Sequence, residues 1–266
     1  MCVSNHHYAS YLSPKVHRSS DGCDFSDFVA RFKPEHLDIN CDNIHEVKIG
    51  KVLGSGSVRE VYEGYWNGSK FALKISYKGK NISKTTQEAA VLYELRREPN
   101  IIRLVGWCNE TIVLPKLDRK YADFRKDSTE RALQISLDIA KGVQQMHAIN
   151  VTHGDIKWSQ FLYDKRGKLL LGDLDLMQFT GFSNKNEKCK FMTRGYGPFD
   201  ERSDIGRIAL LLGDILKGIN EKSIEHKAME DLIEKASSSN MRHPPSATKI
   251  VKRIEAILRN YKTSQD

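Results

Sequence analysis

The chain has 266 residues, 39% of them hydrophobic, and a formal net charge of +8. This length suits one domain of ordinary size and excludes a second large one. No run of about eighteen apolar residues occurs, so no transmembrane segment is predicted. The positive charge favours acidic partners or a solvated basic face, but zinc-ligand spacing and interleaved basic and aromatic residues are absent, so no nucleic-acid partner is expected.

Residues 1–46 mix Ser, His, Asp and Lys without a clear hydrophobic period. We expect an N-terminal extension that is partly disordered or wraps around the domain that follows. The first dozen residues are polar and lack the apolar core of a secretory signal. Residues 47–262 are predicted to form the folded domain.

A glycine-rich turn between two strands is predicted at residues 52–62. Apolar residues flank Gly54-Ser55-Gly56, and small residues let backbone N–H groups approach a phosphate closely. Asn67-Gly68 then predicts a tight hairpin. The next strand, residues 71–75, is apolar except for Lys74, and a lysine on a core strand is costly unless an anion pairs with it.

A helix follows this strand, and a carboxylate heads its apolar stripe. The stripe falls at i, i+3, i+4 and i+7 and consists of Glu88, Val91, Leu92 and Leu95. Glu88 is therefore expected to face inward, toward Lys74. The alternative is a capping box at residues 85–88, in which Glu88 only satisfies the helix N-terminus.

Further along, residues 112–114 predict a short strand that ends in Pro115-Lys116-Leu117. Thr129 begins a long helix whose apolar face is typical of a buried helix and contains Ile135, Ile139, Val143 and Met146. Later helices are expected from Asp204, around residues 226–236 and around 246–261.

Residues 151–160, with the sequence Val-Thr-His-Gly-Asp-Ile-Lys-Trp-Ser-Gln, precede Gly172-Asp173-Leu174-Asp175. Phosphoryl transfer needs one carboxylate that orients the attacking hydroxyl, a second that holds magnesium on the phosphates, and a lysine that offsets charge. Asp155, Asp173 and Lys157 are candidates for these three roles.

Taken in order, these motifs resemble the protein kinase superfamily over about residues 47–260. The resemblance implies an α+β fold with two lobes. The small N-lobe, β-rich with one long helix, is expected at about residues 47–117, and the larger, mainly helical C-lobe at about 118–262.

Within this superfamily the chain resembles the divergent secretory-pathway kinases, which include protein O-mannose kinase and the vertebrate lonesome kinase group. Four details carry this resemblance: Asn40-Cys41 before the first strand, a glycine-rich turn without its third glycine, Ser159-Gln160-Phe161-Leu162, and Asp173-Leu174-Asp175.

The resemblance implies a phosphotransferase, leaning toward Ser/Thr, that uses ATP with Mg²⁺ or Mn²⁺ and transfers the γ-phosphate to a hydroxyl of a protein or glycan. It assigns Asp155 and Lys157 to catalysis and Asp173 and Gln160 to the metal. The residues expected around the nucleotide are Leu53, Gly54, Ser55, Gly56, Val61, Ala72, Lys74, Glu88, Leu114, Lys116 and Leu117. Asp204 is expected to tie down the catalytic loop, or else to cap its own helix.

Three departures from the family pattern keep other readings open. Arg59 replaces the third glycine, where we expect a bulky cation above the phosphates; Gln160 replaces an asparagine; and Asp175 replaces the glycine of the metal-binding motif. A catalytically weak or inactive scaffold is one alternative, and a kinase for glycans or small alcohols is another. Gly154 stands where most kinases have arginine, so a clamp for a phosphorylated activation segment is not expected. That segment is expected to run from Asp173 to about residue 198.

The location of the protein is left open by the sequence. Four acceptor sequons begin at Asn67, Asn81, Asn109 and Asn150, and five cysteines allow up to two disulfides. These features and the resemblance favour the secretory lumen or the extracellular space. A cytoplasmic location is expected instead if the N-terminus as given is complete.

Overall fold

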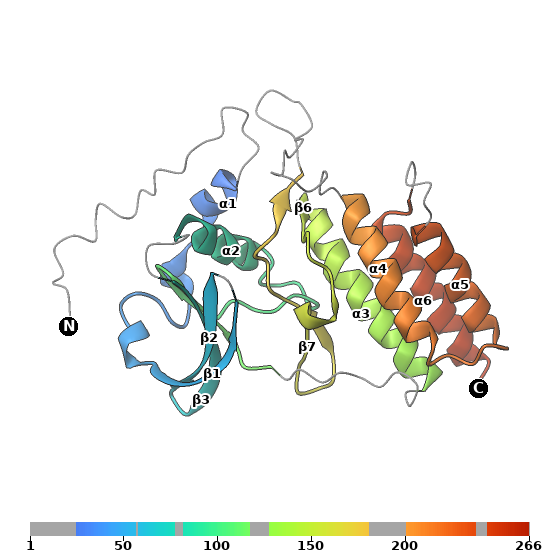
Figure 1. The fold of residues 1–266 in the computed structure, drawn as a ribbon, viewed down its shortest axis with the longest axis horizontal. Helices are drawn as coiled ribbons and strands as arrows, with labels where there is room; N and C mark the ends of the chain where they lie inside the picture. The colour runs from blue at the N-terminus through green and yellow to red at the C-terminus, as the bar shows by residue number, and fades with distance from the viewer. Residues whose placement is uncertain are drawn as a thin grey trace, which may run out of the picture.

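The computed structural model describes residues 25–56, 58–77, 82–117, 128–180, 201–237 and 244–265. Figure 1 shows a sheet with helix α2 beside it, and a separate group of long helices that makes up the other half of the molecule. The predicted α+β fold with a β-rich lobe and a helical lobe is confirmed. Among the helices of the described residues, none combines the length and apolar character needed to cross a membrane.

The small lobe is built on a five-stranded antiparallel sheet with the order β1-β2-β3-β5-β4. Its strands are β1 (Lys48–Ser55), β2 (Arg59–Trp66), β3 (Ser69–Ser76), β4 (Gly106–Cys108) and β5 (Thr111–Pro115). The predicted hairpin joins β2 to β3, with Asn67 at φ 46° and Gly68 at φ 72°. Two consecutive positive φ values suit a two-residue turn whose twist matches the strands.

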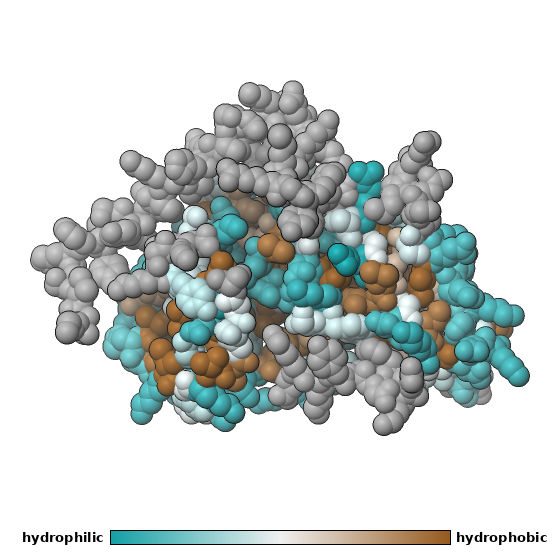
Figure 2. All heavy atoms as spheres, viewed as in Figure 1, coloured by the Kyte–Doolittle hydropathy of each residue, from teal (hydrophilic) through white to brown (hydrophobic). Residues whose placement is uncertain are grey.

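The surface of this lobe carries apolar side chains as well as charges. Figure 2 shows hydrophobic atoms gathered over the region of β1 to β3. On edge strand β1, the side chains of Ile49 and Val52 are 60% and 52% exposed. The apolar stripe of α2 (Ile82–Glu94), in contrast, faces the interior, since Val91 and Leu92 are buried, as is Leu95 directly after the helix. The predicted inward face of this helix is confirmed.

The residues before the sheet pack against the small lobe. Helix α1 (Ser26–Arg31) lies against α2, and two short 3₁₀ helices, η2 (Pro34–His36) and η3 (Ile44–Glu46), follow it. The buried rings of Phe25 and Phe28 contact Phe179, with centroids 6.4 and 6.1 Å apart. A disulfide between Cys41 and Cys108 ties this segment to β4. The predicted extension therefore has an ordered part that braces α2.

We expect Phe28→Ala to lower the free energy of unfolding by about 3 kcal/mol, because the substitution empties a buried aromatic site between α1 and β9. Urea unfolding followed by circular dichroism measures the change. Asp27→Ala, on the exposed face of the same helix, is the matched control. Equal stability of the two variants would contradict the bracing role of α1.

The large lobe consists of helices α3 (Thr129–Ala148), α4 (Glu201–Leu216), α5 (Ile224–Ser237) and α6 (Ala247–Thr263), which lie side by side in Figure 1. Ser128 caps α3 through the N–H of Arg131, and Ser246 caps α6 through the N–H of Lys249. The predicted inner face of α3 is fully buried. Short elements between the lobes are β6 (Val151–Thr152), η5 (Trp158–Gln160), β7 (Phe161–Tyr163), β8 (Leu169–Leu171) and β9 (Gln178–Phe179).

Candidate active site

Lys74 on β3 is the centre of the polar contacts between the lobes. Its Nζ donates to Oε1 of Glu88 at 2.9 Å and to Oδ1 of Asp173 at 2.6 Å. The expected approach of Glu88 to Lys74 is thus confirmed. The capping-box alternative is wrong, because α2 begins at Ile82 and Thr85 lies inside it, with its hydroxyl 2.9 Å from that of Ser76.

Burial and charge act in opposite directions on this pair. Burial alone would lower the pKa of Lys74, but three neighbouring carboxylates raise it above its ordinary value. Burial would likewise raise the pKa of Glu88, and the cations Lys74 and Arg59 bring it below its ordinary value instead. Both groups are therefore charged, and Lys74 places a positive charge on β3 of the small lobe.

The catalytic-loop residues form a second group of contacts. Nζ of Lys157 lies 2.6 Å from Oδ2 of Asp155, and the amide nitrogen of Gln160 donates to the same oxygen at 2.7 Å. Asp155 keeps 30% of its side chain exposed, so a substrate hydroxyl has access to it. Three of the predicted catalytic and metal residues are thus joined by direct contacts.

Helix α4 holds the loop that carries Asp155 in place. Asp204, in the first turn of that helix, accepts the backbone N–H groups of His153 and Gly154 at 2.8 and 3.0 Å and contacts Nε2 of His147 at 2.9 Å. The carboxylate is 1% exposed. Of the two readings of Asp204, these contacts favour the tie to the catalytic loop over the helix cap.

Gly154 has a conformation that a side chain would strain. Its φ is +79°, and an added Cβ would lie 2.6 Å from the carbonyl oxygen of Leu176. Glycine adopts this left-handed conformation freely, whereas other residues are strained there. The arginine that most kinases place here is therefore incompatible with this backbone.

We expect Gly154→Ala to lower the free energy of unfolding by about 1 to 3 kcal/mol and to reduce any activity that depends on Asp155. Gly213→Ala, in α4 where an added Cβ meets nothing, is the matched control and should be neutral or slightly stabilising. Thermal unfolding of both variants measures the difference. A harmless Gly154→Ala would show that the loop backbone is adaptable.

The catalytic loop is also linked to the segment that carries Asp173. Nε2 of His153 lies 2.9 Å from the carbonyl oxygen of Gly172, and the N–H of Gly172 donates to the carbonyl of Gln160 at 2.9 Å. Asp173 itself has a φ of +58°, uncommon for a residue other than glycine. The other neighbour, Leu174, is buried and its N–H donates to Glu88 at 3.3 Å. With both neighbours held, this strained backbone turns the Asp173 carboxylate toward Lys74.

The strand register brings the predicted nucleotide residues together. Gly54 pairs with Val61, which pairs with Lys74; Ala72, two residues before Lys74 on β3, pairs with Leu114. Side chains opposite one another, and those two residues apart, share a face of the sheet.

Val61, Ala72, Lys74 and Leu114 therefore lie on one face. Leu53 sits at a register shift of β1 and is 38% exposed; Ser55 ends the strand and Gly56 follows it, both in exposed positions.

Lys116 and Leu117, which are expected beside the nucleotide, directly follow β5. Leu117 is partly buried against the main core, and Lys116 points its ammonium toward Glu63, with the two groups 3.6 Å apart. The side chain of Lys116 is thus directed to the sheet, which leaves its backbone as the part that can face an adenine. Most of the predicted activation segment, residues 181–198, lies outside the described residues.

The structure corrects the expected place of Arg59. Instead of lying above the phosphates, this arginine is buried at 5% exposure; its Nη1 pairs with Oε2 of Glu88 and lies 3.0 Å from Oδ1 of Asp175. The reason is strand alternation, since Arg59 shares a face of β2 with Val61 and pairs with Ser76, two residues beyond Lys74. That spacing was the available signal, and sequence reasoning missed it.

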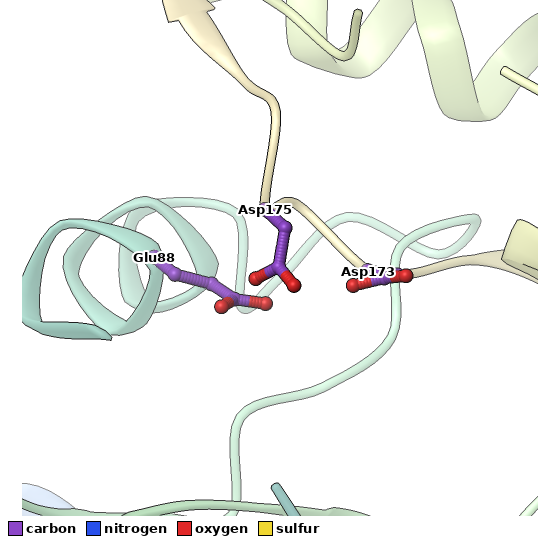
Figure 3. A group of neighbouring side chains, drawn as sticks. All are labelled: Glu88, Asp173 and Asp175. Carbon is purple, nitrogen blue, oxygen red and sulfur yellow. The ribbon is translucent and has the colours of Figure 1, made fainter. Parts of the chain in front are cut away.

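Figure 3 shows the three carboxylates that surround these cations: Glu88 from α2, and Asp173 and Asp175 from the segment after β8. Each contributes an oxygen within 4.8 Å of the others. Asp175 also lies 2.9 Å from Nζ of Lys74.

Two of these carboxylates differ in their proton affinity. Burial raises the pKa of Asp175 above its ordinary value, and repulsion from Glu88 and Asp173 adds to this. For Asp173, Lys74 outweighs the effect of burial and lowers the pKa.

A lysine paired with a helix carboxylate, beside a strained aspartate and a second aspartate–lysine pair on a braced loop, is the arrangement of a phosphotransferase of the two-lobed kinase class. Residues 47–198 match the family described as the protein kinase domain. This match covers more than half of the chain, so the chain belongs to the protein kinase family. Helices α4 to α6 lie beyond the matched residues.

Curated relatives agree with this assignment. One "Probable serine/threonine-protein kinase" of Dictyostelium discoideum is 27% identical over 202 aligned positions, and the match covers 66% of this chain and 15% of that protein. Another from the same organism, drkC, is 26% identical over 286 aligned positions, and the match covers 87% of this chain and 37% of the relative. Serine/threonine-protein kinase STY17 of Arabidopsis thaliana is 23% identical over 203 aligned positions, and the match covers 66% of this chain and 34% of the relative. The chain thus spans well under half the length of these relatives.

Proposed function

We propose that this protein kinase uses ATP with Mg²⁺ or Mn²⁺ and phosphorylates a serine or threonine hydroxyl. The observation that carries the proposal is Lys74, which contacts Glu88 of the small lobe and Asp173 of the large lobe at once. The relatives named as serine/threonine-protein kinases support the choice of acceptor. Lys157, two residues after Asp155, agrees with it.

Each contact suggests a role in the transfer. Asp155 would accept a hydrogen bond from the acceptor hydroxyl and orient its oxygen, and Lys157 beside it would offset charge on the transferred group. Lys74, held by Glu88, would pair with the nucleotide phosphates. These phosphates would then replace part of the carboxylate charge that now surrounds Lys74.

The donor set fits a divalent cation. Asp173 keeps 43% of its side chain exposed. The amide nitrogen of Gln160 donates to Asp155, so the amide oxygen of Gln160 points away from Asp155. Carboxylate and amide oxygens are ligands that Mg²⁺ and Mn²⁺ prefer. A cation there would neutralise charge on the phosphates; orientation of the acceptor stays with Asp155.

The scaffold alternative rests on the altered glycine-rich turn and on Gln160. The position of Arg59 weakens it, because a buried arginine that pairs with Glu88 and Asp175 does not obstruct the phosphate side of the turn. A glycan kinase related to protein O-mannose kinase differs from our proposal only in its acceptor, so an assay that identifies the phosphorylated acceptor separates the two.

The test is transfer of labelled γ-phosphate from ATP, with magnesium or manganese, to the protein itself and to mixed protein and glycan acceptors. Asp155→Asn is the control. Label on Ser or Thr that the control lacks would support the proposal, whereas label on glycan alone would favour the O-mannose kinase type. If neither label nor nucleotide binding is found, the protein is a scaffold and the proposal is wrong.

We further propose that the protein matures in the secretory pathway, like the divergent secretory-pathway kinases that its sequence resembles. The disulfide between Cys41 and Cys108 supports this, because such bonds persist in oxidising compartments, and the sequon at Asn67 lies in an exposed turn. Mass spectrometry of the protein from its native cells, without reduction, should find the linked cysteine peptides and a glycan on Asn67. Free thiols together with an unmodified Asn67 would place the protein in a reducing compartment.

A further inference from the structure

Two of the departures from the family pattern are in contact with each other. Arg59 replaces the third glycine of the turn, and Asp175 replaces the glycine of the metal-binding motif. They are far apart in the sequence, yet the guanidinium Nη1 of Arg59 lies 3.0 Å from Oδ1 of Asp175. At both positions a family member with glycine has no side chain, so neither charge is part of the shared kinase machinery.

The pair is joined to the predicted catalytic residues on both sides. Arg59 also pairs with Oε2 of Glu88, and Asp175 lies 2.9 Å from Nζ of Lys74. Glu88 in turn accepts the backbone N–H of Leu174 at 3.3 Å. Strands β2 and β3, helix α2 and the segment after β8 are thereby connected through one cluster of charges, of which Figure 3 shows the three carboxylates.

The charges explain why both substitutions occur together. Three carboxylates, those of Glu88, Asp173 and Asp175, share two cations in this cluster. Without Arg59, Lys74 alone would face all three carboxylates, and mutual repulsion would push one of them away. Removing one partner of a buried ion pair is strongly unfavourable because the other charge stays behind uncompensated.

We propose that Arg59 and Asp175 are positioning residues, whose ion pair holds Lys74, Glu88 and Asp173 in the arrangement that binds the nucleotide phosphates. This inference rests on the proposed function. It also assigns α2 a fixed position that needs no phosphorylated activation segment, in keeping with the absence of an arginine at Gly154.

A double-mutant cycle tests the proposal with Arg59→Met, Asp175→Asn and the double variant. We expect Arg59→Met to lower kcat/KM for ATP by roughly tenfold or more, mainly through KM, because three carboxylates then repel the phosphates. In the Asp175→Asn background the same change should have an effect of about threefold at most, since Lys74 then faces only Glu88 and Asp173. Arg59→Lys, which keeps the charge, should restore part of the activity.

An exposed pair provides the matched control. Arg103 and Asp38 are 2.6 Å apart, and more than half of each side chain is exposed, so the cycle of Arg103→Met and Asp38→Asn should show no coupling in kcat/KM. Thermal unfolding of every variant separates positioning from folding. If the effects of the two substitutions are coupled in stability but additive in kcat and KM, the positioning role is wrong.

Two other results would also overturn it. Equal impairment by Arg59→Met with and without Asp175 would mean that Arg59 acts on the nucleotide directly, and an unimpaired Arg59→Met would mean that the pair is dispensable. If the wild-type protein transfers no phosphate, the proposed function fails by itself. In that case the inference is tested by the dissociation constant of a non-hydrolysable ATP analogue with Mg²⁺, measured for the wild type, the two single variants and the double variant. Arg59→Met should then weaken binding much less in the Asp175→Asn background than in the wild type.

Discussion

Asp155→Asn is expected to reduce phosphate transfer by roughly a hundredfold to ten thousandfold, the range that a well-placed general acid or base contributes. The carboxylate is half-buried beside Lys157 and accepts the amide of Gln160, so its replacement by an amide of the same shape removes the charge and keeps the packing. Initial rates with labelled ATP measure the effect.

Binding and folding should be spared in this variant. Asp155 contacts Lys157 and Gln160 but not Lys74, so the dissociation constant for an ATP analogue with Mg²⁺ should change by about threefold at most. Asp38→Asn, on the surface of the small lobe, is the control for loss of a carboxylate alone. Rates in Asp155→Asn that match those of the control would mean that another residue orients the acceptor.

Asp204→Ala is expected to have the largest effect on stability, a loss of about 3 kcal/mol or more in the free energy of unfolding. The carboxylate accepts the N–H groups of His153 and Gly154 inside the large lobe, and its removal leaves one buried and one half-buried donor without this acceptor. Each such donor costs about 1 to 3 kcal/mol. Urea unfolding measures the loss.

The same variant should also lose activity, because the loop that carries Asp155 is no longer held to α4. Asp231→Ala is the matched control: its carboxylate forms an exposed pair with Lys235 on α5, and its loss should cost about 0.5 kcal/mol at most. A stable Asp204→Ala protein with normal rates would show that the catalytic loop keeps its shape without this anchor.

Local patterns were sufficient to predict the elements and many of their partners. The helical spacing of Glu88 with Val91 and Leu92 placed the carboxylate on the inner face of α2, and the structure has it 2.9 Å from Lys74. The hairpin at Asn67-Gly68 followed from turn chemistry alone. Such features depend on a few neighbouring residues, which is why they can be read from the chain.

The partners of Arg59 could not be read in this way. Its alternation with Val61 on β2 predicts which face of the sheet it occupies, but Asp175 becomes its partner only when the segment after β8 returns to the small lobe. Likewise, the reason for glycine at position 154 is the carbonyl of Leu176, which approaches it from that same segment.

Hydrophobic period and motif spacing are local properties, so they were enough to predict the order of the elements, the inner faces of α2 and α3, and the types of the candidate catalytic residues. How the charges are shared depends instead on the packing of the two lobes. Arg59, Lys74, Glu88, Asp173 and Asp175 come from both lobes, and their pairing depends on distances of 2.6 to 3.0 Å that exist only after the lobes have packed.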